Sequence, residues 1–283
     1  MGAEVSDMPR LWPSPLCLTH TEPVEARDYR YFDTRFAAMA HRGGFFSETD
    51  RERENTLYAF ARAVERGYRY LETDLHASAD GVLFAFHDST LDRVTDAVGV
   101  PERLPWSALA RVRIAGADPI PRFDELLEAL PESRFNVDLK VPQAIDPLAR
   151  VLDAHNAHDR VCVGSFSSAR IRAFRRRTGG RVATAAGPAG VAWQAYAPLG
   201  RRIVASPGVV LQVPARAWRD RVPVLTRGLL RTAHAAGRAV HVWTVNDRTE
   251  MERLIDLGVD GLVSDRIDVL AEVLTERGLW EGN

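Results

Sequence analysis

Acidic and imidazole side chains alternate with other residues in the short stretch from Tyr70 to His76. Glu72, Asp74 and His76 share one parity, and the other parity is filled by Leu71, Thr73 and Leu75. In a β-strand the two parities face opposite ways, so both carboxylates would project from one face. Carboxylates this close repel each other unless a cation or a shared proton lies between them, and oxygen ligands suit a hard cation. The alternative is a half-exposed strand whose polar face meets water.

A second alternating stretch could add to this acidic face. Asn136, Asp138 and Lys140 share one parity, while Val137 and Leu139 take the other. Asp138 would then give a third carboxylate for a common cation. The alternative is a structural ion pair between Asp138 and Lys140 or Arg42. Lys140 is the chain's only lysine among 37 basic residues, which marks the position because lysine and arginine fit buried sites differently.

Two histidines complete the set of groups that could do chemistry. His41 and His87 each follow an apolar run, and His41 is followed by Arg42. Histidine is the side chain best suited to exchange protons near neutral pH, although a lone one is more often structural. Together with the carboxylates and the basic groups, the two histidines favour an acid–base site.

The elements that must position these residues follow a regular alternation. Eight strand–helix units are predicted, with strands that start near residues 36, 70, 135, 160, 181, 209, 239 and 260. This number and spacing predict an α/β fold of the closed parallel (β/α)8 TIM barrel type, in which chemistry lies at the C-terminal ends of the strands. An open doubly wound sheet is the competitor, but the glycine-rich phosphate turn that it usually carries is absent. Residues 1–35 are interpreted as an N-terminal extension and 36–283 as the barrel domain.

Composition excludes several classes of partner. The 283 residues are 46% hydrophobic, and the net charge of -1 gives no reason to expect nucleic acid or an anionic membrane. The two cysteines argue against a disulfide scaffold and a cysteine zinc site. We see no signal peptide and no apolar run of membrane-spanning length, so we expect a cytoplasmic protein without stable membrane insertion and leave its oligomeric state open.

A set of ordered motifs resembles the glycerophosphodiester phosphodiesterase family. The first group is HRG at 41–43, ENT at 54–56, ETD at 72–74, DG at 80–81 and HDSTLDRVT at 87–95. The second is NVDLK at 136–140, WTVN at 243–246 and GVDGLVSD at 258–265. Each triplet alone is weak, but the ordered set extends from residue 36 to about 270.

The resemblance implies a TIM barrel with a small insertion after the second strand, placed here at about 76–122. It implies a divalent cation, Ca²⁺ or Mg²⁺, held by the residues that match Glu72, Asp74 and Asp138, and His41 with His87 as the acid–base pair. It also implies that Arg42 and Lys140 contact the phosphate. Asp138 stands where the family usually has glutamate, so the ligand reaches less far. Trp243 is interpreted as a wall of the glycerol pocket, with a plain core role as the equal alternative.

The implied activity is hydrolysis of a glycerophosphodiester, such as glycerophosphocholine or glycerophosphoethanolamine, to sn-glycerol 3-phosphate and an alcohol. In the family the proposed nucleophile is the neighbouring glycerol hydroxyl, and the sequence does not separate that route from direct attack by water. One alternative is lysophospholipase D-like hydrolysis of lysophospholipids in the same site. Another is a non-catalytic barrel that binds a phosphodiester, against which both histidines and all three carboxylates argue.

Overall fold

The protein forms a closed parallel barrel in the computed structural model, which describes residues 24–47, 50–187, 208–217 and 222–282. Around the barrel the strands run in the order β8-β7-β6-β2-β1-β13-β12-β9, and a parallel bridge from Ala185 to Val210 joins the two ends of this order. The strands are β1 (Ala37–Phe45), β2 (Tyr70–Ala77), β6 (Arg134–Leu139), β7 (Val161–Gly164), β8 (Ala183–Thr184), β9 (Val210–Pro214), β12 (Ala239–Trp243) and β13 (Gly261–Arg266). The predicted (β/α)8 barrel is therefore confirmed.

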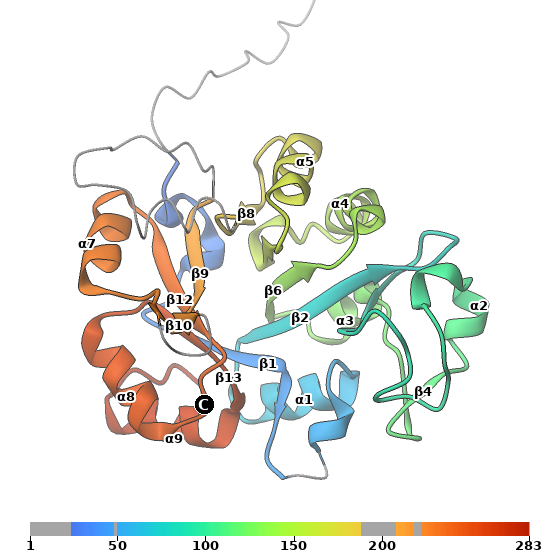
Figure 1. Cartoon of the computed structure of the whole chain (residues 1–283), viewed down its shortest axis with the longest axis horizontal. Coiled ribbons are helices and arrows are strands. Elements are labelled where there is room, and N and C mark those ends of the chain that lie inside the picture. The colour runs from blue at the N-terminus through green and yellow to red at the C-terminus, as the bar shows by residue number, and fades with distance from the viewer. Residues whose placement is uncertain (1–23, 48–49, 188–207, 218–221, 283) are drawn as a thin grey trace, which may run out of the picture.

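Helices cover the outside of the barrel (Figure 1). They are α1 (Leu57–Glu65), α3 (Phe123–Ala129), α4 (Ile145–Ala154), α5 (Ser168–Thr178), α7 (Arg227–Ala235), α8 (Arg248–Leu257) and α9 (Ile267–Glu276). Their apolar faces and the outward faces of the strands bury one continuous core, which includes Phe60, Phe135 and Leu270. Burial of this apolar area is the main force that holds the layers together. The sequence also predicts a helix at 191–199, and these residues lie outside the described part of the chain.

Local sequence sets where the helices begin and end. Thr56, Ser167, Thr226 and Asp247 cap α1, α5, α7 and α8, each accepting a hydrogen bond from a backbone N–H of the first turn. The helices α5 and α8 each end at a glycine with positive φ, a conformation that side chains with a Cβ disfavour. The starts of these four helices and the ends of α5 and α8 therefore follow from signals within a few residues of each boundary.

The insertion follows β2 and forms its own small unit at one side of the barrel (Figure 1). The strand β3 (Leu83–Ala85) pairs antiparallel with β2, and the unit continues through the short helix α2 (Trp106–Leu109) and the hairpin of β4 (Arg113–Ile114) and β5 (Asp118–Pro119). Its apolar side chains make a separate core. Side-chain contacts also tie it to the barrel, among them those from Arg53 to Asp118 and from His76 to Glu102.

The other end of the barrel is closed by the segment before β1. Two 3₁₀ helices, Ala26–Asp28 and Arg30–Phe32, lie against the strand starts, and the side chain of Tyr31 is fully buried there. The Tyr70 hydroxyl donates to the backbone carbonyl of Tyr31 at 2.5 Å. The described part of the predicted extension thus fills the floor of the barrel rather than hanging free of it.

None of the described helices combines the length and the apolar character needed to cross a bilayer.

Candidate active site

Strand register brings the three carboxylates to one end of the barrel. Asp74 of β2 lies directly opposite Asp138 of β6, and His41 of β1 lies opposite Glu72 of β2. Parallel neighbours in register carry their side chains on the same face. The carboxylates that share one parity in the sequence therefore form one cluster at the C-terminal ends of the strands. Barrels of this type have their active sites at that end.

Lys140 joins two of these carboxylates. Its Nζ lies 2.9 Å from Asp74 Oδ1 and 2.8 Å from Asp138 Oδ2. Arg42 Nε lies 3.3 Å from Asp74 Oδ2. Burial alone would raise the pKa of Asp74, but Lys140 and Arg42 outweigh it and lower that pKa. The only lysine of the chain is thus at the centre of the acidic cluster.

Glu72 is the carboxylate whose negative charge is least offset by nearby positive groups. Burial, followed by the nearby charge of Asp74, raises its pKa to about 7. It contacts the backbone N–H of Arg42 at 3.2 Å and lies 3.7 Å from His41 Nε2. A carboxyl group buried in this way favours an added positive charge beside it.

His41 is held in one orientation by the last strand of the barrel. Its Nδ1 lies 2.6 Å from Asp265 Oδ1, and Asn246 Nδ2 donates to Asp265 Oδ2 at 2.7 Å. An ionised carboxylate only accepts hydrogen bonds, so the ring carries its proton on Nδ1 and turns Nε2 toward Glu72. Burial would lower the pKa of His41, but Glu72 and Asp265 raise it above the ordinary value.

His87 is held by its own neighbour in the chain. Its Nδ1 lies 2.6 Å from Asp88 Oδ1, and its side chain is one-third exposed. Burial lowers the pKa of His87, a change that the charge of Asp74 only partly offsets. Arg42 acts electrostatically on both histidines, and Asp74 acts on His87 as Glu72 acts on His41. Both imidazoles therefore border the same charged cluster.

An irregular stretch in the second half of β1 brings the main chain close to α1. Arg42 has φ 53°, and Gly43 and Gly44 also have positive φ. A Cβ added to Gly43 would lie 2.6 Å from the Cβ of Ala59, so only glycine fits this approach. The sequence predicts Asn55 as the cap of this helix, which is wrong, because Thr56 is the cap. Asn55 instead donates to Asp74 Oδ2 at 3.2 Å and steadies it.

Other polar residues predicted at strand ends have structural contacts. His76 is buried with its ring stacked on Phe84 and its Nδ1 2.5 Å from Glu102, which places it under the insertion. Ser165, which follows β7, donates to the backbone carbonyl of Leu139 at 2.8 Å. Trp243 is half-buried at the end of β12. Its ring meets that of Phe166 edge-to-face at 5.7 Å.

The three carboxylates suit a divalent cation in their chemistry more than in their present arrangement. The donor set consists of carboxylate oxygens, which hard cations prefer, and Asp138 Oδ1 is buried without a hydrogen-bond partner among the described residues. Within those same residues no three histidine, cysteine or acidic side chains are arranged to hold an ion as they stand. Lys140 occupies the space between Asp74 and Asp138. The set therefore fits a cation in its chemistry, with two of its members now satisfied by an ammonium group.

Sequence reasoning gave no role to several residues that the structure places at the site. Asp265 and Glu54 stand inside quoted motifs, and Arg93 stands in the motif that begins at His87. Their polarity is common on surfaces, so nothing in the sequence pairs them with a histidine or an arginine. Phe166 is 65% exposed beside Trp243, and only its exposure in the folded chain marks it.

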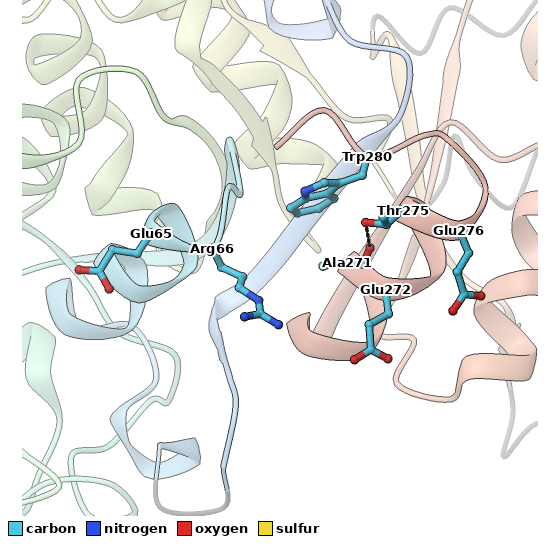
Figure 2. Close-up of a pocket in the computed structure, with 7 residues that line it drawn as sticks. All are labelled: Glu65, Arg66, Ala271, Glu272, Thr275, Glu276 and Trp280. Carbon is cyan, nitrogen blue, oxygen red and sulfur yellow. Dashed lines mark hydrogen bonds between the residues drawn. The ribbon is translucent and has the colours of Figure 1, made fainter. Parts of the chain in front are cut away.

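A groove of about 530 Å³ lies elsewhere, on the outside of the barrel (Figure 2). Its walls come from the end of α1, with Glu65 and Arg66, and from α9, with Trp280 beside them. None of the predicted site residues lines it. The groove is thus separate from the cluster at the strand ends.

Comparison with known proteins places the chain in a family. Residues 41–269 match the model of the glycerophosphoryl diester phosphodiesterase family. A probable glycerophosphodiester phosphodiesterase 2 of Mycobacterium tuberculosis is 40% identical over 250 residues, which cover 87% of this chain and 93% of that protein.

Two solved structures have the same fold. A putative glycerophosphoryl diester phosphodiesterase from Silicibacter pomeroyi gives a TM-score of 0.73 at 21% identity, covering 89% of this chain and 99% of its own. A phosphodiesterase from Oleispira antarctica, in complex with the product sn-glycerol-3-phosphate, gives 0.69 at 23% identity, covering 84% and 96%. The family model and the Mycobacterium relative favour an enzyme over the non-catalytic barrel. The chain belongs to the glycerophosphoryl diester phosphodiesterase family and is a phosphoric diester hydrolase.

Proposed function

We propose that this enzyme hydrolyses small glycerophosphodiesters, such as glycerophosphocholine or glycerophosphoethanolamine, to sn-glycerol 3-phosphate and the free alcohol. The observation that carries the proposal is the pair of oriented imidazoles. His41 and His87 each present Nδ1 to a carboxylate at 2.6 Å, and both border the cluster that contains Arg42. This arrangement leaves both Nε2 atoms for proton exchange with a substrate.

The phosphodiester carries a negative charge, which repels a nucleophile. Arg42 and Lys140 would bind the phosphate oxygens and offset the charge that develops at phosphorus. Glu72, Asp74 and Asp138 would hold a divalent cation, Ca²⁺ or Mg²⁺, which when bound adds positive charge at the same place. The support for this ion is the carboxylate donor set and the raised pKa of Glu72, since burial and then the nearby charge of Asp74 disfavour its ionised form and an added positive charge would favour it.

The two imidazoles would divide the proton transfers between them. One histidine takes the proton of the attacking hydroxyl, which belongs to the glycerol or to water, and the other gives a proton to the leaving alkoxide. An alkoxide is a poor leaving group near neutral pH, so this second transfer lowers the barrier. Trp243 is proposed as a wall for the glycerol part, because it lies at a strand end with an exposed aromatic neighbour.

Product analysis tests the substrate class. The purified enzyme is incubated with glycerophosphocholine and, separately, with lysophosphatidylcholine, and the phosphorus products are identified by ³¹P NMR. We expect sn-glycerol 3-phosphate from the first and little reaction with the second. Faster release of lysophosphatidic acid from the second would replace our proposal with the lysophospholipase D-like activity.

Chelation tests the metal part independently. We expect EDTA to abolish hydrolysis, and added Ca²⁺ or Mg²⁺ to restore it and raise the melting temperature of the chelated protein, because ligands of the native state stabilise it. An unchanged rate in EDTA would remove the cation from the proposal while leaving the histidine pair in place.

A further inference from the structure

One arginine of the insertion lies beside a catalytic histidine. Arg93 is six residues after His87, and its Nε donates to Asp88 Oδ2 at 2.6 Å while Nη2 donates to Asp88 Oδ1 at 3.2 Å. The same Asp88 oxygen lies 2.6 Å from His87 Nδ1. A single carboxylate therefore joins the guanidinium group of the insertion to the imidazole ring.

The same guanidinium group reaches back to the barrel. Arg93 Nη1 donates to Glu54 Oε2 at 3.3 Å, and Nη2 donates to Glu54 Oε1. Glu54 Oε1 also accepts from Arg42 Nη1 at 3.1 Å. The contacts run without a break from His87 through Asp88, Arg93 and Glu54 to Arg42.

We propose that Arg93 is a positioning residue that fixes His87 and Arg42 relative to each other, so that the insertion is part of the active site. The inference rests on the proposed function, because it takes the proton transfer from His87 and the phosphate contact from Arg42. Arg93 itself touches neither group.

The planar guanidinium group of Arg93 suits its position between Asp88 and Glu54. A guanidinium group can bind two carboxylates through fixed N–H directions, whereas an ammonium group is a point charge without that geometry. Burial would raise the pKa of Asp88, but hydrogen bonds from Arg93 and His87 lower it to about 2. Asp88 therefore stays ionised and keeps the proton of His87 on Nδ1.

A purely structural role for Arg93, as a clamp for the insertion, can be separated from positioning. The insertion has its own core and is also held by the bidentate pair of Arg53 and Asp118. That second clamp makes no contact with His87 or Arg42 in the hydrogen bonds of the described residues. The Arg93 side chain is 49% exposed, so its loss should cost little folding stability.

The experiment compares Arg93→Ala with Asp118→Asn, which breaks the second clamp and is the matched control. We expect Arg93→Ala to lower kcat for glycerophosphocholine by about 10 to 100-fold, the scale on which a misplaced catalytic group lowers a rate. Asp118→Asn should keep kcat within about threefold, with similar small changes in melting temperature for both variants. Added guanidinium ion should restore part of the rate of Arg93→Ala, and Arg93→Lys should restore less than the full rate.

A double-mutant cycle adds a test of the chain of contacts. Glu54→Gln should lower kcat in the wild-type background and have a smaller effect in the Arg93→Ala background, because linked groups are not additive. An unchanged kcat in Arg93→Ala, or an equal loss in Asp118→Asn, would overturn the inference. A wild-type enzyme inactive on every glycerophosphodiester would instead overturn the proposed function, so the two failures are distinct.

Discussion

Two histidines of the same barrel, His241 buried and His41 partly buried, differ in their surroundings. His41 on β1 and His241 on β12 lie on the two strands that flank β13. His241 pairs with Gly261, the first residue of β13, and its ring packs against Phe32 of the segment that closes the floor. His41 lies farther along the barrel, opposite Glu72 at the open end.

The difference shows what burial alone does to an imidazole. Burial lowers the pKa of His241 to about 4, and its Nδ1 has no hydrogen-bond partner among the described residues. Burial pushes the pKa of His41 in the same direction, but Glu72 and Asp265 reverse the shift. The carboxylates beside His41 therefore set the direction of its pKa shift, whereas burial sets that of His241.

The largest expected effect is a difference in activity between variants of His41 and of His241. We expect His41→Ala to lower the rate on glycerophosphocholine by roughly 10² to 10⁴-fold, the usual contribution of a general acid or base, and His87→Ala to do the same. His241→Leu should keep the rate within about threefold, because its ring faces the floor. Steady-state kinetics with circular dichroism as the control for folding decide the matter, and equal losses in all three variants would break the comparison.

A smaller effect is expected from substitution of Asp265, the carboxylate that holds His41 in its orientation. Asp265→Ala should lower kcat by about 100-fold with less change in KM, because the imidazole loses the acceptor that holds its tautomer and direction. Asp256→Ala is a suitable control, since that exposed carboxylate pairs with Arg277 on the outer helices. A KM effect alone, with kcat unchanged, would assign Asp265 to binding instead.

The smallest effect is a pH dependence of stability at the floor. His241 has an ordinary pKa of 6.5 when unfolded and about 4 when folded, so the unfolded chain takes up its proton first as the pH falls. The stabilisation present above pH 6.5 is therefore lost progressively toward pH 4, by about 2 kcal/mol between pH 7 and pH 5. Urea unfolding at both pH values should show this extra loss in wild type but not in His241→Leu. Equal losses in the two proteins would mean that His241 is not buried in its neutral form.

Much of the barrel was predictable because its signals are local. Alternating parity placed Glu72 and Asp74 on one face, and Thr56, Gly179 and Gly258 carry cap signals that depend on a few neighbours. The role of Asn55 was misjudged for the same reason, since either Asn55 or Thr56 could cap a helix by local rules. Backbone conformation, with φ 59° at Asn55, decided between them.

What the sequence determined by itself is the chemical inventory and the strand that carries each part of it. Two histidines, three carboxylates, Arg42 and Lys140 are readable because residue type and period-two spacing are properties of short segments. Tertiary structure alone decided the pairings. The contact of His41 with Asp265 joins residues 224 apart, and that of Arg93 with Glu54 joins residues 39 apart. Such contacts depend on how the barrel closes and on where the insertion packs against it. Neither is encoded by the sequence of a short segment.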